Sequence, residues 1–166
     1  MIQRIQTVFL FVACIATIVL LFIPFGTFTG CFSENLTGDC IFNAFTVRLN
    51  VPEPGNSIIA RSYYIGLTLI LSSIISLVSI FLYKNRVKQA KVVSLNMLII
   101  LVALALTYFI YPDFIFKKAN LIYPESECLF NNWGLIIYLI PAVMMVLARR
   151  FILKDEAKVR AADRLR

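Results

Sequence analysis

Four long apolar runs occupy about half of this 166-residue chain and constrain its fold more than any other feature. Their centres contain no Asp, Glu, Lys, Arg or His. A helix of roughly 20 apolar residues matches the ~30 Å hydrocarbon core of a bilayer. The runs therefore predict four membrane-spanning helices, over Ile5–Phe25, Ser62–Tyr83, Val92–Tyr111 and Trp133–Ala148.

Composition agrees with this interpretation, because 60% of the residues are hydrophobic and the mean hydropathy is +0.85. Soluble domains are far less apolar. Inside a bilayer the backbone must satisfy its own hydrogen bonds, which continuous helices do. We predict an all-α membrane protein, a four-transmembrane-helix bundle forming a single membrane domain over residues 1–166. No room is left for a separate soluble catalytic domain.

The basic residues predict the orientation. Twelve of the 16 fall at the N-terminus, between the second and third runs, and after the fourth run. Lys and Arg stay on the cytoplasmic side. Both termini are therefore expected inside, with a net charge of +9 there and −2 outside. The basic pI is thus a topology signal, and no nucleic-acid partner is expected.

Two outer loops follow from this topology, over residues 24–57 and 112–132. In the first, Ile41, Phe45, Val47, Leu49 and Val51 alternate with residues of the other face, and a period of two predicts a strand. Residues 25–32 are its expected partner across the polar turn 33–39. We predict a β-hairpin over the outer mouths of the helices. The apolar triplets 114–116 and 121–123 are expected to pack on it or at the headgroups.

Three of the four cysteines fall in these outer loops. Cys31 and Cys40 flank the predicted turn, which favours a structural disulfide between them in an oxidising compartment. Cys128 is then a free thiol, or it competes for one of the other two. Cys14, in the first span, is interpreted as a small packing residue.

Small and hydroxyl side chains recur along the second span, at Thr68, Ser72, Ser76 and Ser79. Such a stripe lets helices approach closely and hydrogen-bond, so we interpret it as a helix-packing stripe. A polar permeation path along it is the alternative. The chain has no His, and no metal site or cofactor is predicted.

The tail after the fourth span, residues 151–166, has no Gly or Pro and is expected to form a cytoplasmic helix. Glu156 with Arg160, and Asp155 with Lys158, are spaced to form ion pairs. The tail's cations would contact the anionic inner leaflet or dock a membrane or cytoplasmic protein partner. These residues are Lys154, Lys158, Arg160, Arg164 and Arg166.

The two ends of the chain carry a family resemblance. The start Met-Ile-Gln-Arg-Ile-Gln and the end Lys-Asp-Glu…Ala-Asp-Arg-Leu-Arg resemble an uncharacterised family of small four-span inner-membrane proteins of the Bacteroidota. The resemblance implies an inner-membrane, multi-pass location with both termini cytoplasmic and the hairpin in the periplasm. It implies no activity.

The leading functional prediction is a non-enzymatic accessory or scaffold subunit of the inner membrane, because the spans lack ionisable groups for chemistry. One alternative is a quinone-linked thiol-disulfide oxidase, which would use the outer cysteines and Arg61 near a quinone. Its usual Cys-x-x-Cys pair is missing, since eight residues separate Cys31 from Cys40. A small transporter is the other alternative.

Overall fold

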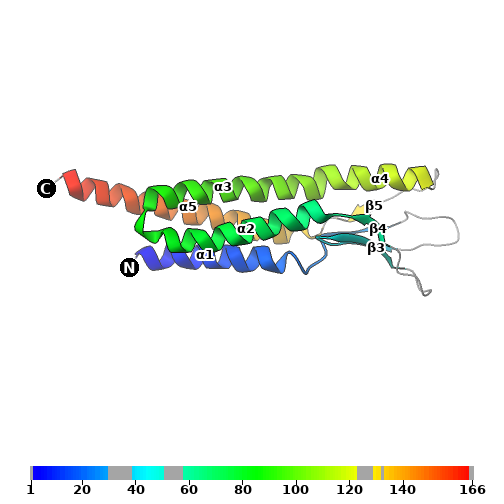
Figure 1. Cartoon of the computed structure of the whole chain (residues 1–166), viewed down its shortest axis with the longest axis horizontal. Helices are drawn as coiled ribbons and strands as arrows, with labels where there is room; N and C mark the ends of the chain where they lie inside the picture. The colour runs from blue at the N-terminus through cyan, green and yellow to red at the C-terminus, as the bar shows by residue number, and fades with distance from the viewer. Residues whose placement is uncertain (1, 30–38, 51–57, 123–128, 132, 165–166) are drawn as a thin grey trace.

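The computed structural model describes residues 2–29, 39–50, 58–122, 129–131 and 133–164. Its long helices form an elongated bundle with a small sheet at one end (Figure 1). The bundle contains α1 (Ile2–Val19), α2 (Tyr63–Phe81), α3 (Arg86–Ala105) and α5 (Leu135–Arg164). Because α1 and α3 each contact both α2 and α5, the four helices close into a ring. The start of α1 and the end of α5 lie at the same end, opposite the sheet.

Among the described residues, three helical segments are long and apolar enough to cross a membrane: Tyr63–Lys84, Arg86–Lys117 and Leu135–Ala162. The segment Ile5–Val19 is a shorter apolar helix. The prediction that the first span continues to Phe25 was wrong, because α1 ends at Val19. Turns, and no longer regular helix, follow α1 at residues 20–22. Pro24 comes shortly before the first strand, and a proline disfavours the helical conformation in the residue before it.

The third helix continues where a loop was predicted. After α3, a π-helical turn (Leu106–Ile110) leads directly into α4 (Tyr111–Ile122). The expected outer loop from residue 112 is therefore wrong for its first half. Pro112 lies inside this continuous helical segment, directly after the π-helical turn, and its missing N–H leaves one backbone carbonyl of the preceding turn without that donor. Ile115 of α4 is buried and Phe116 packs edge-on against Phe28 of the sheet.

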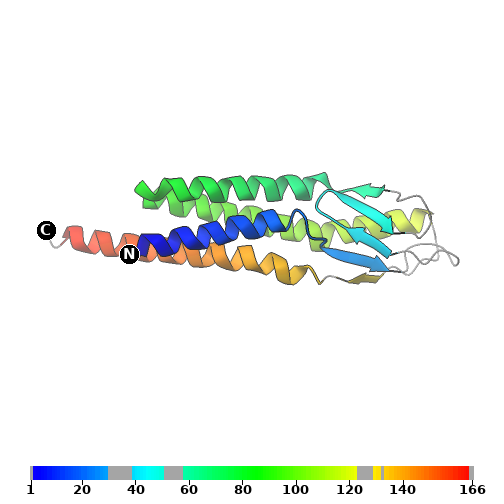
Figure 2. The same cartoon turned by 90° about the horizontal axis from the view of Figure 1, so that it is seen from below.

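The sheet has five antiparallel strands in the order β4-β3-β2-β1-β5. They are β1 (Gly26–Thr29), β2 (Asp39–Phe42), β3 (Thr46–Asn50), β4 (Ile58–Arg61) and β5 (Leu129–Asn131). Thus the predicted hairpin is confirmed as β1 with β2 and is extended by strands from both predicted loops (Figure 2).

The alternating stretch from residue 41 to residue 51 was predicted to be one strand, and this was wrong. A tight turn at residues 43–45 divides it into β2 and β3, closed by the Asn43 N–H donating to the Thr46 carbonyl at 3.0 Å. Phe42, Ala44 and Val47 are buried, whereas Ile41 is half-buried.

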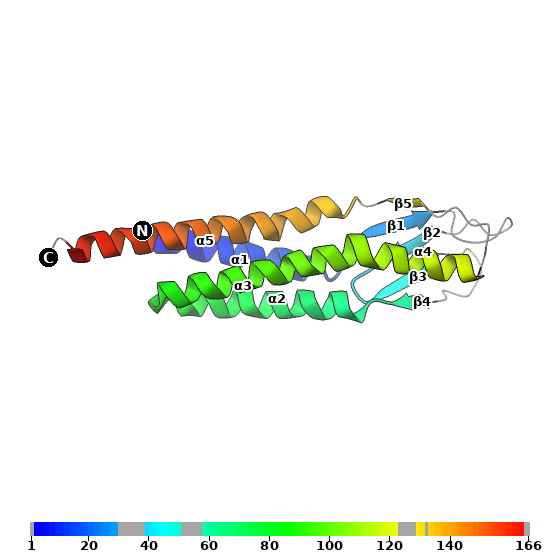
Figure 3. The same cartoon turned by 90° about the horizontal axis from the view of Figure 1, so that it is seen from above.

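Aromatic rings fill the space between the sheet, α4 and the bundle, and α4 covers one face of the sheet (Figure 3). Phe25 packs against both Phe42 of β2 and Tyr138 of α5. Phe28 stacks on Phe130 of β5 with 4.6 Å between ring centroids. Offset and edge-on aromatic pairs of this kind add to the gain from burial. The sheet is therefore joined to the helices through one continuous core.

The β2–β3 turn also caps α2. The Ser62 N–H donates to the Phe45 carbonyl at 2.8 Å, and the Gly66 N–H donates to the Ala44 carbonyl at 3.0 Å. These bonds satisfy N–H groups that a helix start leaves unpaired. The Phe45 ring lies where a Cβ on Gly66 would stand, so only glycine permits this approach.

Candidate functional site: the polar interior of the bundle

Polar side chains lie buried between the helices, although the helices are largely apolar in composition. We call this set the polar interior. It draws on α1, α2, α3, the π-helical turn and α5. Its members are Gln6, Thr17, Ser72, Ser73, Ser76, Ser79, Gln89, Asn96, Thr107 and Asp155.

Side chains of α3 donate hydrogen bonds to α2, from Asn96 near the middle of α3 and from Gln89 in its first turn. The Asn96 Nδ2 donates to the Ser76 Oγ at 2.7 Å, and the Gln89 Nε2 donates to the Ser79 carbonyl at 2.9 Å. Asn96 and Gln89 are seven residues apart, two helical turns, so they share one face of α3. Ser72 Oγ and Asn96 Oδ1 are buried without a hydrogen-bond partner among the described residues.

At the end of the bundle that holds both termini, α5 is tied to α1 and α3. Gln6 Nε2 donates to the Phe151 carbonyl at 3.1 Å. Arg86 Nη1 lies 3.1 Å from Asp155 Oδ2 and also donates to the Asp155 carbonyl at 3.4 Å. Both charged side chains are largely buried, with 24% of Arg86 and 12% of Asp155 exposed.

At the sheet end, the π-helical turn faces α5. The Thr107 Oγ1 lies 3.0 Å from the Tyr138 Oη and 2.7 Å from the Ala103 carbonyl. Because the carbonyl can only accept, Thr107 donates to Ala103 and accepts from Tyr138. Tyr108, the next residue, donates to the Phe25 carbonyl at 3.4 Å. π-Helical turns frequently mark functional positions, and this one places two hydroxyls at the junction of bundle and sheet.

The polar interior supplies hydroxyls, amides and one ion pair. Among the described residues, no group of three or more His, Cys, Asp or Glu could hold a metal ion. Hydrogen bonds between helices fix their register and rotation in a membrane, where apolar contact alone discriminates poorly. The arrangement is suited to holding four helices in one geometry.

The predicted packing stripe lies mostly in this interior. Ser72, Ser76 and Ser79 are buried, whereas Thr68 is half-buried and donates to the Ile65 carbonyl of its own helix. Of these four side chains, that of Ser76 accepts the hydrogen bond that Asn96 of α3 donates. Its role in helix packing stays a prediction.

The cysteine predictions fall largely outside the described residues, where both Cys31 and Cys128 lie. Cys40 is buried in β2, paired in register with Phe28. The Cys31–Cys40 disulfide and the free thiol at Cys128 stay predictions. Arg61, assigned to a quinone in the oxidase alternative, is exposed, and its guanidinium lies 5.9 Å from the centre of the Tyr63 ring.

In the tail, Lys154, Lys158 and Arg160 are exposed. The side chain of Arg164 and all of Arg166 lie outside the described residues. The predicted Glu156–Arg160 ion pair is confirmed. The Asp155–Lys158 pairing was wrong, because Asp155 faces inward to Arg86.

Sequence reasoning missed the Arg86–Asp155 pair and both glutamines, yet a signal for Asp155 was present. The buried residues of α5 repeat every seven positions, as Tyr138, Met145 and Ile152 and as Pro141, Ala148 and Asp155. Such a repeat defines a buried seam between helices. Carried past the apolar run into the tail, it places Asp155 in that seam.

Comparison with known proteins adds a family and no activity. A family model described as a domain of unknown function (DUF4293) matches residues 2–165. No curated protein matches the sequence.

Proposed function

The chain belongs to the DUF4293 family, and we propose that it is a non-enzymatic accessory protein of a bacterial inner membrane that holds a partner protein at the cytoplasmic face. In this proposal all four bundle helices span the membrane. Both termini are cytoplasmic and the sheet is periplasmic. The Bacteroidota source indicated by the two end motifs is part of the same proposal.

Exposed aromatic residues at both ends of α2 support the membrane placement. Tyr63 and Tyr64 are exposed at the sheet end, and Tyr83 is exposed after the opposite end. At 1.5 Å per residue these positions are about 29 Å apart along the helix. Tyrosines favour the two interfaces of a bilayer whose hydrocarbon core is ~30 Å thick. Basic residues after the second and fourth spans favour the cytoplasm for the other end.

The observation that carries the accessory role is the projecting end of α5. The helix extends beyond the other helices at the end of the bundle that holds the termini (Figure 1). Among the described side chains of α5, Asp155 is the last that is buried, and every residue from Ala157 to Ala162 is exposed. Short isolated helices are marginal in water, so this segment gains from a surface that packs against it.

The chemistry of this projecting segment defines the partner. Lys158 and Val159 are both exposed, and alanines at 157, 161 and 162 leave the helix surface flat. A protein offering carboxylates and a shallow apolar contact would complement it. Membrane binding through the same surface would be weak, because alanine buries little apolar area.

Site-specific photo-crosslinking in cells tests this proposal. A crosslinking amino acid replaces Val159, and the matched control replaces Val143, an exposed valine on the same helix within the membrane-spanning part. We expect one protein adduct of defined mass at position 159 and none at position 143. A second test is truncation after Glu156, which keeps the Arg86–Asp155 pair and should abolish co-purification of that protein. Equal adducts at both positions, or a partner retained by the truncated chain, would overturn the proposal.

A further inference from the structure

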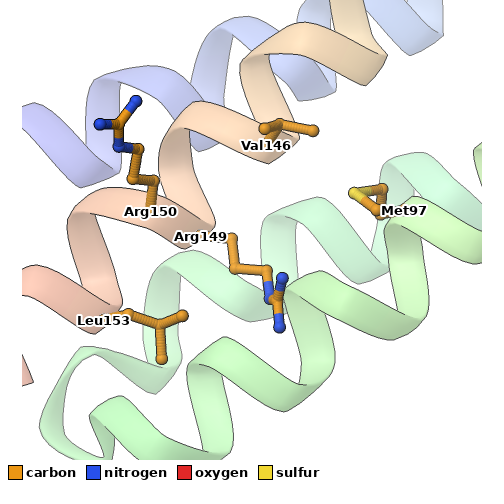
Figure 4. A pocket seen from close by; sticks show the side chains of 5 residues that line it. All are labelled: Met97, Val146, Arg149, Arg150 and Leu153. Atoms are coloured by element: carbon orange, nitrogen blue, oxygen red, sulfur yellow. The ribbon is translucent and has the colours of Figure 1, made fainter.

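An open groove of about 230 Å³ lies between α3 and α5 on the outside of the bundle. Its lining combines apolar and cationic side chains, namely Met97, Val146, Arg149, Arg150 and Leu153 (Figure 4). Met97 is half-buried, whereas Val146 and Leu153 are exposed. The groove is therefore accessible from the surroundings of the bundle and is no part of the polar interior.

The two arginines of the groove differ in direction. Arg149 reaches from α5 toward the side of the groove formed by α3, and Arg150 lies on the opposite flank of α5 (Figure 4). The ion pairs among the described residues are Arg86–Asp155 and Arg160–Glu156, so neither groove arginine has a carboxylate partner there. A guanidinium with no carboxylate beside an apolar wall is complementary to an anion that carries a hydrocarbon chain.

The position of the groove along α5 indicates the source of that anion. Residues 135–148 contain no charge, and Arg149 is the first charged residue after them. Val146 lies about one turn deeper than Arg149 on the apolar side. The groove thus crosses the level at which the uncharged part of α5 ends. At such a boundary, basic pockets between transmembrane helices bind anionic lipid headgroups.

We infer that this groove binds one anionic phospholipid, with its phosphate on Arg149 and the start of an acyl chain against Val146 and Met97. The guanidinium donates in parallel to two phosphate oxygens, a geometry that Lys cannot reproduce. The inference rests on the proposed membrane placement. It is independent of the partner at the end of α5.

Native mass spectrometry of the full chain in detergent tests the inference, with phosphatidylglycerol and phosphatidylcholine titrated separately. We expect one phosphatidylglycerol to bind more tightly than any phosphatidylcholine. Arg149→Gln should weaken that binding about tenfold, the loss typical of a hydrogen bond to a charged group. Lys88→Gln removes the same charge at an exposed position of α3 outside the groove lining and should leave binding unchanged.

Two further measurements distinguish the groove from general charge attraction. Val146→Trp fills the apolar wall and should also weaken phosphatidylglycerol binding, whereas Val143→Trp, outside the groove lining, should not. Inorganic phosphate should fail to displace the bound lipid. Unchanged binding in Arg149→Gln, equal losses in Arg149→Gln and Lys88→Gln, or displacement by inorganic phosphate would each overturn the inference. Circular dichroism checks that every variant keeps its helices.

Discussion

Arg86 and Asp155 form an ion pair, with 3.1 Å between Nη1 and Oδ2, that joins the first turn of α3 to a buried position of α5 just before its exposed part. The pair stands where the bundle ends and the exposed part of α5 begins. It therefore links the direction in which α5 projects to the packing of the bundle. The contact is mainly electrostatic, because Oδ2 has no well-aligned hydrogen bond among the described residues.

Removing Arg86 should destabilise the bundle more than removing Asp155. Arg86→Gln leaves a buried carboxylate without its cation and should cost about 2–3 kcal/mol of unfolding free energy, below the range for fully buried pairs. Asp155→Asn leaves a partly exposed arginine and should cost ~1 kcal/mol. Equilibrium unfolding in detergent measures both. Arg160→Gln, which breaks the exposed pair with Glu156, is the control and should cost about 0.5 kcal/mol or less. Equal effects of all three variants would contradict the assignment.

The Asn96–Ser76 hydrogen bond gives a second prediction, on helix pairing. Ser76→Ala leaves the Asn96 amide without this acceptor and should lower the unfolding free energy by roughly 0.6–1.7 kcal/mol, the range measured between membrane helices. Ser94→Ala is the matched control, because the Ser94 hydroxyl bonds to the Ala90 carbonyl of its own helix. The bundle is expected to tolerate that change. A loss at Ser94 as large as that at Ser76 would show that α2 and α3 are not held by this bond.

The Thr107–Tyr138 contact predicts that removing the Thr107 hydroxyl costs more stability than removing the Tyr138 hydroxyl. Thr107→Val removes the acceptor and leaves a buried tyrosine hydroxyl unpaired, which costs about 1–3 kcal/mol. Tyr138→Phe removes the donor, yet Thr107 keeps its bond to the Ala103 carbonyl, so the loss should be smaller. Thermal unfolding of the two variants, beside Thr68→Val as a control, measures the difference. The reverse order would mean that Thr107 donates to Tyr138.

Much of the helical architecture could be predicted from hydrophobic length. The second predicted span, Ser62–Tyr83, agrees closely with the helical segment Tyr63–Lys84. The predicted tail helix exists as the last part of α5, which runs from Leu135 to Arg164 and is not ended by Pro141. Apolar runs determine these elements locally, because a membrane-length helix satisfies its own backbone.

Elements that depend on contacts between distant residues could not be predicted in this way. The alternation from Ile41 to Val51 has a period of two, and this period does not say which face is buried. Burial of Phe42 is decided by the rings of Tyr111 on α4 and Phe130 on β5, which are distant in sequence. The bond from Asn43 to Thr46 that closes the turn is local, but the turn is also held by the bonds that the distant Ser62 and Gly66 donate to it at the start of α2. Likewise, α4 gains its aromatic partners Phe28 and Phe42 only when the sheet has formed.

Gly66 provides the sharpest test of how the sheet is attached to the helices. Gly66→Ala places a methyl group where the Phe45 ring packs, and such overpacking should cost about 1–3 kcal/mol of unfolding free energy. The turn would have to move, which would weaken the bonds from Ser62 and Gly66 that cap α2. Hydrogen exchange should then accelerate at the amides of residues 62 and 66 while the middle of α2 stays protected. The double variant Gly66→Ala with Phe45→Ala removes the ring and should be less destabilised than the sum of its single changes. Additive losses would show that the ring and the glycine are not in contact.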